Sequence, residues 1–276
     1  MAEIKAADVA KLRKTTGSGM LDCKQALEEA NGDFDTAIDI LRKKGQKVAN
    51  KRADRDATEG VVLALTTANN KAGVVTVLNC ETDFVAKNED FVNFAQSIAN
   101  IALEKLPATL ADLLALPYGN EGTINDKIIT HIGVIGEKLD LSYYEKIEAA
   151  SVVGYIHQGN RLASLVGFTT TFPVTAGKDV AMQIAAMNPV AVDKDRVAQS
   201  VIDKEIEIGK ELAIQEGKPA DMAEKIAIGR LNKFFKESTL IEQQFVKDNK
   251  LSVGQYITSI DKDAKVTDFK RYGLGN

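Results

Sequence analysis

The sequence predicts an α+β protein, in which a small helical unit precedes two related units built from antiparallel strands and helices. Three observations lead to this prediction. Apolar residues recur at helical spacing in three short segments up to residue 45. A pattern of two strands followed by a helix then occurs twice, starting near residues 61 and 152. Finally, a long amphipathic segment, residues 193–236, folds back on itself as a helical hairpin.

The composition is that of an ordinary soluble globular protein. The chain has 276 residues, a net charge of -4 and a hydrophobic fraction of 45%, so bulk nucleic-acid binding is not indicated. Cys23 and Cys80 offer no disulfide framework and fit a reducing compartment. No apolar run approaches the ~18 residues of a membrane span. Residues 1–5 do not resemble a leader peptide, and we therefore expect a cytoplasmic protein.

We expect three units along the chain. Residues 1–55 form the helical module with a basic linker, residues 56–148 the first core subdomain, and residues 149–276 the second core subdomain, which includes the hairpin at 193–236. A chain of this length accommodates two or three compact units, because domains typically have ~100–200 residues.

The first unit is predicted to contain three short helices. The first ends near residues 15–17, where a glycine follows two threonines. The second carries one apolar stripe and is stopped by Asn31-Gly32; the stripe consists of Met20, Cys23, Ala26, Leu27 and Ala30. The third helix starts near Phe34 and is expected to end at Gly45. Such a small core is marginal by itself, so a docking role is favoured over a catalytic one.

Residues 42–55 form a basic segment, with seven Lys or Arg residues against the single acid Asp54. Two interpretations are open. The segment is either a solvated helix or linker, or a contact surface for an acidic partner or for RNA. The segment has no interleaved aromatic residues for stacking on bases, which weakens the RNA interpretation.

The two related units are predicted in parallel terms. The predicted strands are 61–65, 74–78, 139–147, 152–156, 162–168 and 265–272, and the predicted helices begin near residues 88, 123, 179 and 252. The hairpin is expected to turn at 217–219, with a seam of large apolar residues between its arms. The seam is assigned to Val197, Val201, Ile208 and Leu212 against Met222, Ile226, Leu231, Phe234 and Phe235. The hairpin either packs on the body or projects as an arm for a partner.

The corner after the strand at 74–78 carries an acid and a large ring side by side, Asp83 and Phe84. The corner is either structural, with Asp83 capping a turn and Phe84 tucked beneath the helix, or a contact site held by rigid elements. The second unit keeps the flanking Thr171 and Val174 but has Phe172 followed by proline at the corresponding place. An acid that was needed only to build the corner would be expected in both copies, so the functional interpretation is favoured.

No catalytic motif is convincing. Gly154 and Gly159 have the glycine spacing of a phosphate loop, but Asn-Arg follows in place of Lys-Ser/Thr, and the pair lies in a predicted hairpin. The only histidines, His131 and His157, are too few for a typical histidine zinc site. Cys80 lies in an apolar strand, where a thiol is usually inert. We therefore expect no metal, no cofactor and no chemistry of the protein's own.

Two motifs resemble the signatures of the translation elongation factor Ts family. Residues 12–20, LRKTTGSGM, match its amino-terminal signature, and residues 78–87, LNCETDFVAK, match its second signature. Shorter matches occur at 155–157, 217–219, 243–246 and 253–255. Both signatures occur in the family's order, so the resemblance is specific and extends over nearly the whole chain.

The resemblance implies a guanine nucleotide exchange factor for elongation factor Tu in translation elongation. It implies an amino-terminal module like ubiquitin-associated domains, which docks on the GTPase. It also implies that Thr82, Asp83, Phe84 and Val85 disturb the magnesium site of that partner. It further implies partner contacts by Leu12, Arg13, Thr16, Met20 and His157. We expect binding to GDP-bound and nucleotide-free elongation factor Tu and a homodimer contact through the hairpin, and no membrane or direct nucleic-acid partner.

Overall fold

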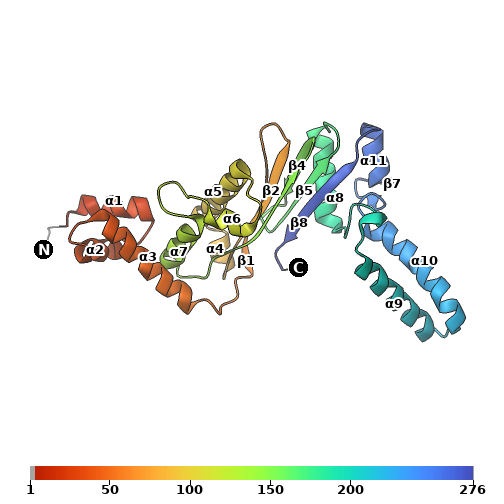
Figure 1. Ribbon diagram of the computed structural model, residues 1–276, viewed down its shortest axis with the longest axis horizontal. Helices are drawn as coiled ribbons and strands as arrows, with labels where there is room; N and C mark the ends of the chain where they lie inside the picture. The colour runs from red at the N-terminus through yellow and green to blue at the C-terminus, as the bar shows by residue number, and fades with distance from the viewer. Residues whose placement is uncertain (1–3, 276) are drawn as a thin grey trace.

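The α+β class is confirmed by the computed structural model, which describes residues 4–275. Residues 1–3 of the expected first unit, with the start of the chain on which the leader-peptide expectation depends, lie outside the described residues, as does residue 276. The molecule is elongated: helices at the amino-terminal end lead to a central pair of sheets, and a helical hairpin projects beyond them (Figure 1). No helix within residues 4–275 combines the length and apolar character that crossing a membrane requires.

Most elements agree with the prediction. The helices are α1 (Ala6–Thr16), α2 (Met20–Glu29), α3 (Phe34–Lys51), α4 (Asp83–Ala86), α5 (Glu89–Lys105), α6 (Leu110–Ala115), α7 (Ile124–Ile135), α8 (Val174–Met187), α9 (Gln199–Gln215), α10 (Ala220–Ser238) and α11 (Val253–Ile260), with a 3-10 turn η1 at Lys194–Arg196. The strands are β1 (Glu59–Thr66), β2 (Ala72–Cys80), β3 (Asp140–Glu148), β4 (Ser151–Ile156), β5 (Leu162–Phe168), β6 (Gln244–Phe245), β7 (Asp248–Ser252) and β8 (Val266–Gly273). The short helices α4 and α6 and the β6–β7 hairpin were not predicted.

The two main sheets are antiparallel and pack on each other. Their orders are β1-β2-β3 and β4-β5-β8. Val62, Val75 and Val77 of the first sheet share a buried cluster with Val152 and Leu165 of the second. Helices cover the opposite faces, so both faces of β2 are covered and every residue of this strand is buried. This is why its sequence is largely apolar, with only Thr76 and Asn79 as polar side chains, rather than alternating.

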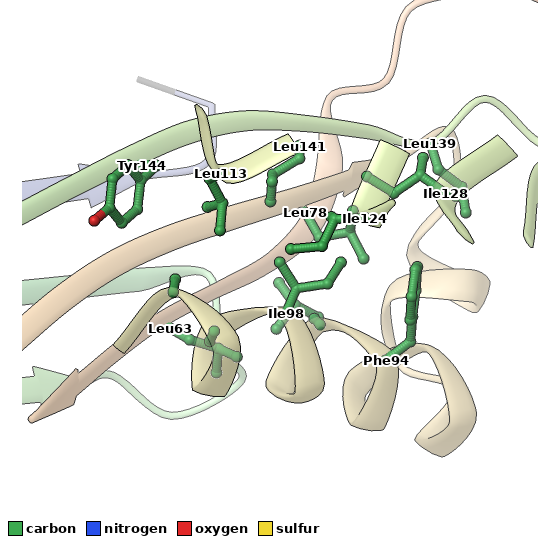
Figure 2. Close-up of a cluster of buried hydrophobic side chains, with 14 of the residues drawn as sticks. Leu63, Leu78, Phe94, Ile98, Leu113, Ile124, Ile128, Leu139, Leu141 and Tyr144 are labelled. Atoms are coloured by element: carbon green, nitrogen blue, oxygen red, sulfur yellow. The ribbon is translucent and has the colours of Figure 1, made fainter. Parts of the chain in front are cut away.

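Helices complete the outer layer on each sheet. Figure 2 shows Phe94 and Ile98 of α5, Leu113 of α6 and Ile124 of α7 meeting side chains of the first sheet such as Leu78. The second sheet is covered in the same way by α8 and α11 (Figure 1). The centre of the fold therefore has four layers: helices, the first sheet, the second sheet and helices again. The amino-terminal helices and the α9–α10 hairpin extend from these layers.

The expected end of the third helix at Gly45 is wrong. The helix α3 continues through Gly45 to Lys51, because this glycine serves a helix crossing rather than a cap. A Cβ placed on Gly45 would lie 2.6 Å from the carbonyl oxygen of Ile129 in α7, and a Cβ on Gly133 would lie 2.7 Å from the Cα of Gly45. Two facing glycines thus let α3 and α7 approach backbone to backbone, which joins the amino-terminal helices to the core.

The basic segment 42–55 is therefore largely helix, and several of its charges are used within the molecule. Arg42 donates to the carbonyl oxygen of Glu121 at 3.2 Å, Lys44 pairs with Asp22 at 2.5 Å, and Arg52 pairs with Glu81 at 2.9 Å. Most of the segment is thus helix rather than free linker, and its contact with an acidic partner or with RNA stays a prediction.

Replacing Gly45 with alanine is expected to lower the free energy of unfolding by about 1–3 kcal/mol, because the added methyl group meets backbone that cannot rotate away. Helix propensity alone predicts the opposite sign. Gly229 of α10 is the matched control, since a Cβ there meets nothing within 4 Å; alanine should add about 0.5–1 kcal/mol at that position. Urea unfolding of the two variants measures both effects, and a stabilised Gly45→Ala protein would contradict the close crossing.

The hairpin seam also differs from the prediction. Its two helices meet through small residues: Ala213, Ala223 and Ala227 are buried, and a Cβ on Gly209 would lie 3.0 Å from the Cα of Ala227. Because the backbones approach so closely, larger side chains are displaced from the seam. Several of these remain exposed, namely Ile208, Leu212, Ile214, Met222 and Ile228. Of the two alternatives, the projecting arm is the one observed (Figure 1).

Candidate functional site

The corner between β2 and α5 contains one turn of helix, α4. Thr82 is its cap residue: the backbone is extended, and Oγ1 accepts a hydrogen bond from the Val85 N–H at 3.4 Å. Asn88 then caps α5, its side chain accepting from the Asp90 N–H at 2.8 Å. Two successive caps give the chain a fixed path from strand to helix, so the side chains of α4 have defined directions.

Phe84 projects from this turn into solvent. It is 83% exposed, more than any other large apolar side chain in the described part of the chain. Its neighbours Val85 and Ala86 are partly buried against the first core. The turn therefore carries one exposed ring, while its other apolar residues are anchored in the core.

Asp83 is ionised and paired at the surface. Lys87, one helical turn later, donates to its carboxylate at 2.6 Å. This hydrogen bond is the main reason that the pKa of Asp83 lies below its ordinary value. The guanidinium of Arg161, in the turn between β4 and β5, pairs with Glu59 and also interacts electrostatically with Asp83. The corner therefore presents a carboxylate beside the exposed ring, with two cations near it.

The corresponding corner of the second unit has a different construction. Phe172 is 3% exposed and stacks on Phe168 with the ring centroids 4.3 Å apart. Its N–H donates to Ser151 Oγ at 3.0 Å. The helix α8 begins directly after Pro173, earlier than the start near residue 179 that the sequence predicts. Here the ring is part of the core, and the corner offers no projecting side chain at this position.

A groove separates the corner from the amino-terminal helices. Its volume is about 870 Å³, and its lining includes Phe84 and Val85 on one side and residues 14–17 on the other. Parts of the two sequence signatures, which are far apart in the chain, thus face the same hollow. The fold brings Thr16 and Phe84 to one surface of the molecule.

The structure places the other predicted contact residues as follows. Leu12 is fully buried in the core of the helical module. Thr16 is also buried, and its hydroxyl donates to the Leu12 carbonyl oxygen at 2.9 Å. Arg13 is exposed, and Met20 is 46% exposed. His157 is exposed on the β4–β5 turn, with Nδ1 2.8 Å from the Tyr155 hydroxyl, and it does not line the groove. The side chains of Arg13, Met20 and His157 are therefore accessible to a partner, whereas those of Leu12 and Thr16 are packed inside the helical module.

The floor of the groove contains a histidine that the sequence did not single out for this place. His131 stacks on Phe94 with the ring centroids 3.8 Å apart, and its Nδ1 lies 3.0 Å from the Lys127 carbonyl oxygen. Burial lowers the pKa of His131 to about 4, against a smaller opposing effect of that hydrogen bond. The charges of Lys127, Glu121 and Asp90 contribute less. His131 is therefore neutral at pH 7, and its ring lines the groove as an uncharged aromatic surface.

This histidine should make stability fall as the pH drops from about 6.5 to about 4. In that range the unfolded chain binds a proton on His131 and the folded chain does not, so protonation favours unfolding by up to about 3 kcal/mol. His131→Phe keeps the ring on Phe94 and removes the titration. Urea unfolding at pH 7.5 and pH 4.5 should show a smaller loss for the variant. Equal losses in both proteins would contradict this assignment.

Cys80 is not a nucleophile. It is fully buried, and its thiol donates to the Thr82 carbonyl oxygen at 3.2 Å. Burial, together with the charges of Glu137 and Glu59, raises the pKa of Cys80 to about 12, so the thiolate is absent near neutral pH. Within the described residues, no three His, Cys, Asp or Glu side chains converge as metal ligands would.

Comparisons with known proteins agree with the sequence signatures. The family model described as Elongation factor TS matches residues 81–276. A protein named Elongation factor Ts from Amoebophilus asiaticus is 54% identical over 275 residues, with 99% of each chain covered. Proteins of the same name from Flavobacterium psychrophilum, 51% identical with 100% of each chain covered, and from Porphyromonas gingivalis, 50% identical with 97% of each chain covered, are similarly close.

Proposed function

Because this chain belongs to the elongation factor Ts family, we infer that it is a guanine nucleotide exchange factor for elongation factor Tu, and we propose that residues 82–85 promote GDP release by disturbing the magnesium site of that GTPase. The observation that carries the second part is the exposure of Phe84, 83% on a capped turn. A partner protein that covers this ring would remove most of its surface from water.

The physical basis is the dependence of GDP binding on magnesium. The ion is coordinated by both the protein and the nucleotide phosphates, and it demands near-ideal octahedral geometry. A ring inserted between elements of the GTPase can shift the groups that hold this shell. The adjacent Asp83 carboxylate adds negative charge at the same place. Since the coupling between two ligands is reciprocal, a protein that weakens GDP binding is itself displaced by nucleotide. Exchange therefore needs no chemistry by this chain.

The amino-terminal helices are proposed to dock on the GTPase. Of the contact residues predicted in the first signature, Arg13 and Met20 are exposed and are assigned direct contacts. Leu12 and Thr16 are assigned the supporting role of holding that surface, and His157 a contact at the edge of the corner. The groove beside Phe84 supports this arrangement, because it joins the two signatures in one continuous surface.

The homodimer contact through the hairpin stays a prediction. The exposed apolar residues on α9 and α10, such as Leu212 and Met222, support a contact there, since an isolated arm rarely exposes such side chains. A protein that sediments as a monomer at micromolar concentration would contradict this part of the proposal.

The exchange function is tested with purified elongation factor Tu loaded with a fluorescent GDP analogue. Adding the chain in catalytic amount, with excess unlabelled GDP, should accelerate release of the analogue. The chain should also form a stoichiometric complex with nucleotide-free elongation factor Tu, and added GDP should dissociate that complex. Unchanged release together with no complex would contradict the function itself.

A further inference from the structure

We propose that Glu137 is a positioning residue for the exchange step: its carboxylate holds residues 81–82, and thereby fixes the direction in which α4 presents Asp83 and Phe84. The proposal rests on the proposed function of the corner. It concerns a residue 55 positions away in the sequence, at the start of the loop between α7 and β3.

The contacts of Glu137 with the corner are specific. Its Oε2 accepts from the backbone N–H groups of Glu81 and Thr82, both at 3.1 Å. Its Oε1 accepts from the Thr82 hydroxyl at 2.7 Å. The carboxylate therefore satisfies three donors on two consecutive residues. Hydrogen bonds to a charged acceptor are stronger than neutral ones, so these bonds define the path of the chain just before α4.

Residue 81 in turn holds the loop that carries Glu137. We call the hydrogen bonds between residues 81–82 and residues 137–138 the clamp. The side chain of Glu81 accepts from the Lys138 N–H at 2.6 Å, while the backbone of Glu81 donates to Glu137. Arg52, which follows the last turn of α3, donates from Nη1 to both Glu81 carboxylate oxygens at 3.0 and 2.9 Å. Burial tends to raise the pKa of Glu81, but the bonds from Lys138 and Arg52 lower it overall. Residues 81–82, the loop at 137–138 and the end of α3 are thus held together.

Thr82 transmits the clamp to the projecting ring. Its hydroxyl donates to Glu137 and at the same time accepts from the Val85 N–H, so the cap of α4 and the clamp share one oxygen atom. A helix of four residues has no stability of its own, and its orientation must come from outside. A fixed orientation matters because a contact group that is loose before binding loses entropy on binding.

The loop reaches the corner because α7 ends at a glycine. Gly136 has φ +79°, in the left-handed region, and the turn that follows directs the side chain of Glu137 to the end of β2. The second unit shows how a corner is held without this device: there the Ser151 side chain donates to the Thr170 carbonyl oxygen at 2.8 Å and accepts from the Phe172 N–H. The corner with the exposed Phe84 is thus held by a carboxylate, whereas the corner with the buried Phe172 is held by a neutral hydroxyl group.

The test uses variants that separate the geometry of the clamp from its charge. Glu137→Gln can keep an oxygen on the two backbone N–H groups and turn its amide toward Thr82. Glu137→Asp keeps the charge but retracts it by one methylene group, and Glu137→Ala removes both. Glu145→Gln is the matched control, because it changes a carboxylate on the neighbouring strand β3 that pairs with Lys270 at 3.3 Å.

The measurement is the rate of GDP release from elongation factor Tu as a function of exchange-factor concentration. We expect Glu137→Ala and Glu137→Asp to lower the rate at saturation about three- to tenfold, with Glu137→Gln and Glu145→Gln within about twofold of the unmodified protein. Hydrogen exchange at the amides of residues 81, 82 and 85 should be faster in the two impaired variants.

The outcomes are distinguishable. A role limited to stability would lower the melting temperature of Glu137→Ala and leave the rate of the folded protein at saturation unchanged, which would overturn the proposal. If Glu137→Ala does not fold, Glu137→Asp decides: a normal rate at saturation for this folded variant would also overturn the proposal. Failure of the unmodified chain to accelerate release would instead contradict the proposed function.

Discussion

Replacing Phe84 with alanine is expected to slow GDP release from elongation factor Tu by about ten- to a hundredfold. Burying a phenylalanine side chain is worth roughly 1.5–3 kcal/mol, and each ~1.4 kcal/mol corresponds to a factor of ten. The ring is 83% exposed in the free protein, so almost all of this burial free energy can still be gained when the ring contacts a partner. The loss should appear in the rate at a saturating concentration of the variant.

The same substitution should leave the fold intact. An exposed side chain contributes little to stability, and the free energy of unfolding should change by no more than about 0.5 kcal/mol. Ile260→Ala in α11, at another exposed apolar residue, is the control for loss of surface hydrophobicity and should keep the normal rate. Adding Asp83→Ala should slow release further. A double variant that releases the fluorescent nucleotide as fast as the unmodified protein would refute the role given to this corner.

Replacing Phe172 with alanine should lower stability and leave the exchange rate of the folded protein unchanged, the reverse of what is expected for Phe84→Ala. This ring is 3% exposed and stacks on Phe168, so its removal leaves a cavity in the second core and should cost about 3–5 kcal/mol of unfolding free energy. Chemical denaturation followed by circular dichroism measures this loss. The fraction that remains folded should still promote exchange at the normal rate, when the rate is corrected for active protein below the unfolding transition.

The pair of substitutions tests the asymmetry between the two related units. Phe84 and Phe172 occupy corresponding corners, yet one ring faces solvent and the other faces the core. If Phe172→Ala slowed exchange by as much as Phe84→Ala while remaining equally folded, the action on the magnesium site could not be assigned to the first corner alone.

The periodic elements could be predicted from the sequence because their signals are local. The two strand pairs, the helix α5 and both arms of the hairpin follow from apolar spacing and turn residues. The family was also accessible, since the segments at 12–20 and 78–87 are contiguous in the chain. The projecting corner is indicated by the difference between Asp83-Phe84 and Phe172-Pro173, two contiguous segments that can be compared without knowing any contact between them.

Two of the differences, the end of α3 and the seam of the hairpin, have one physical origin. Gly45 looks like a helix end in the sequence, but its lack of a side chain allows the crossing with Gly133 of α7. Gly209 and Ala227 play the same part in the hairpin, where close approach displaces Ile208 and Leu212 from the seam. In each case a small residue looks locally like a break or a weak position. Its real function depends on a helix that is distant in the sequence.

The class of the fold, the family and the corner at residues 82–85 could be predicted from the sequence, because each depends on neighbouring residues. How the corner is held and what lies beside it depend on contacts between segments that are distant in the chain. Glu137 contacts Thr82 across 55 positions, and His131 forms the floor of a groove whose opposite wall comes from residues 14–17. No periodicity reports such contacts, since they arise where the pairing of β2 with β3 and the crossing of α3 with α7 bring remote segments together.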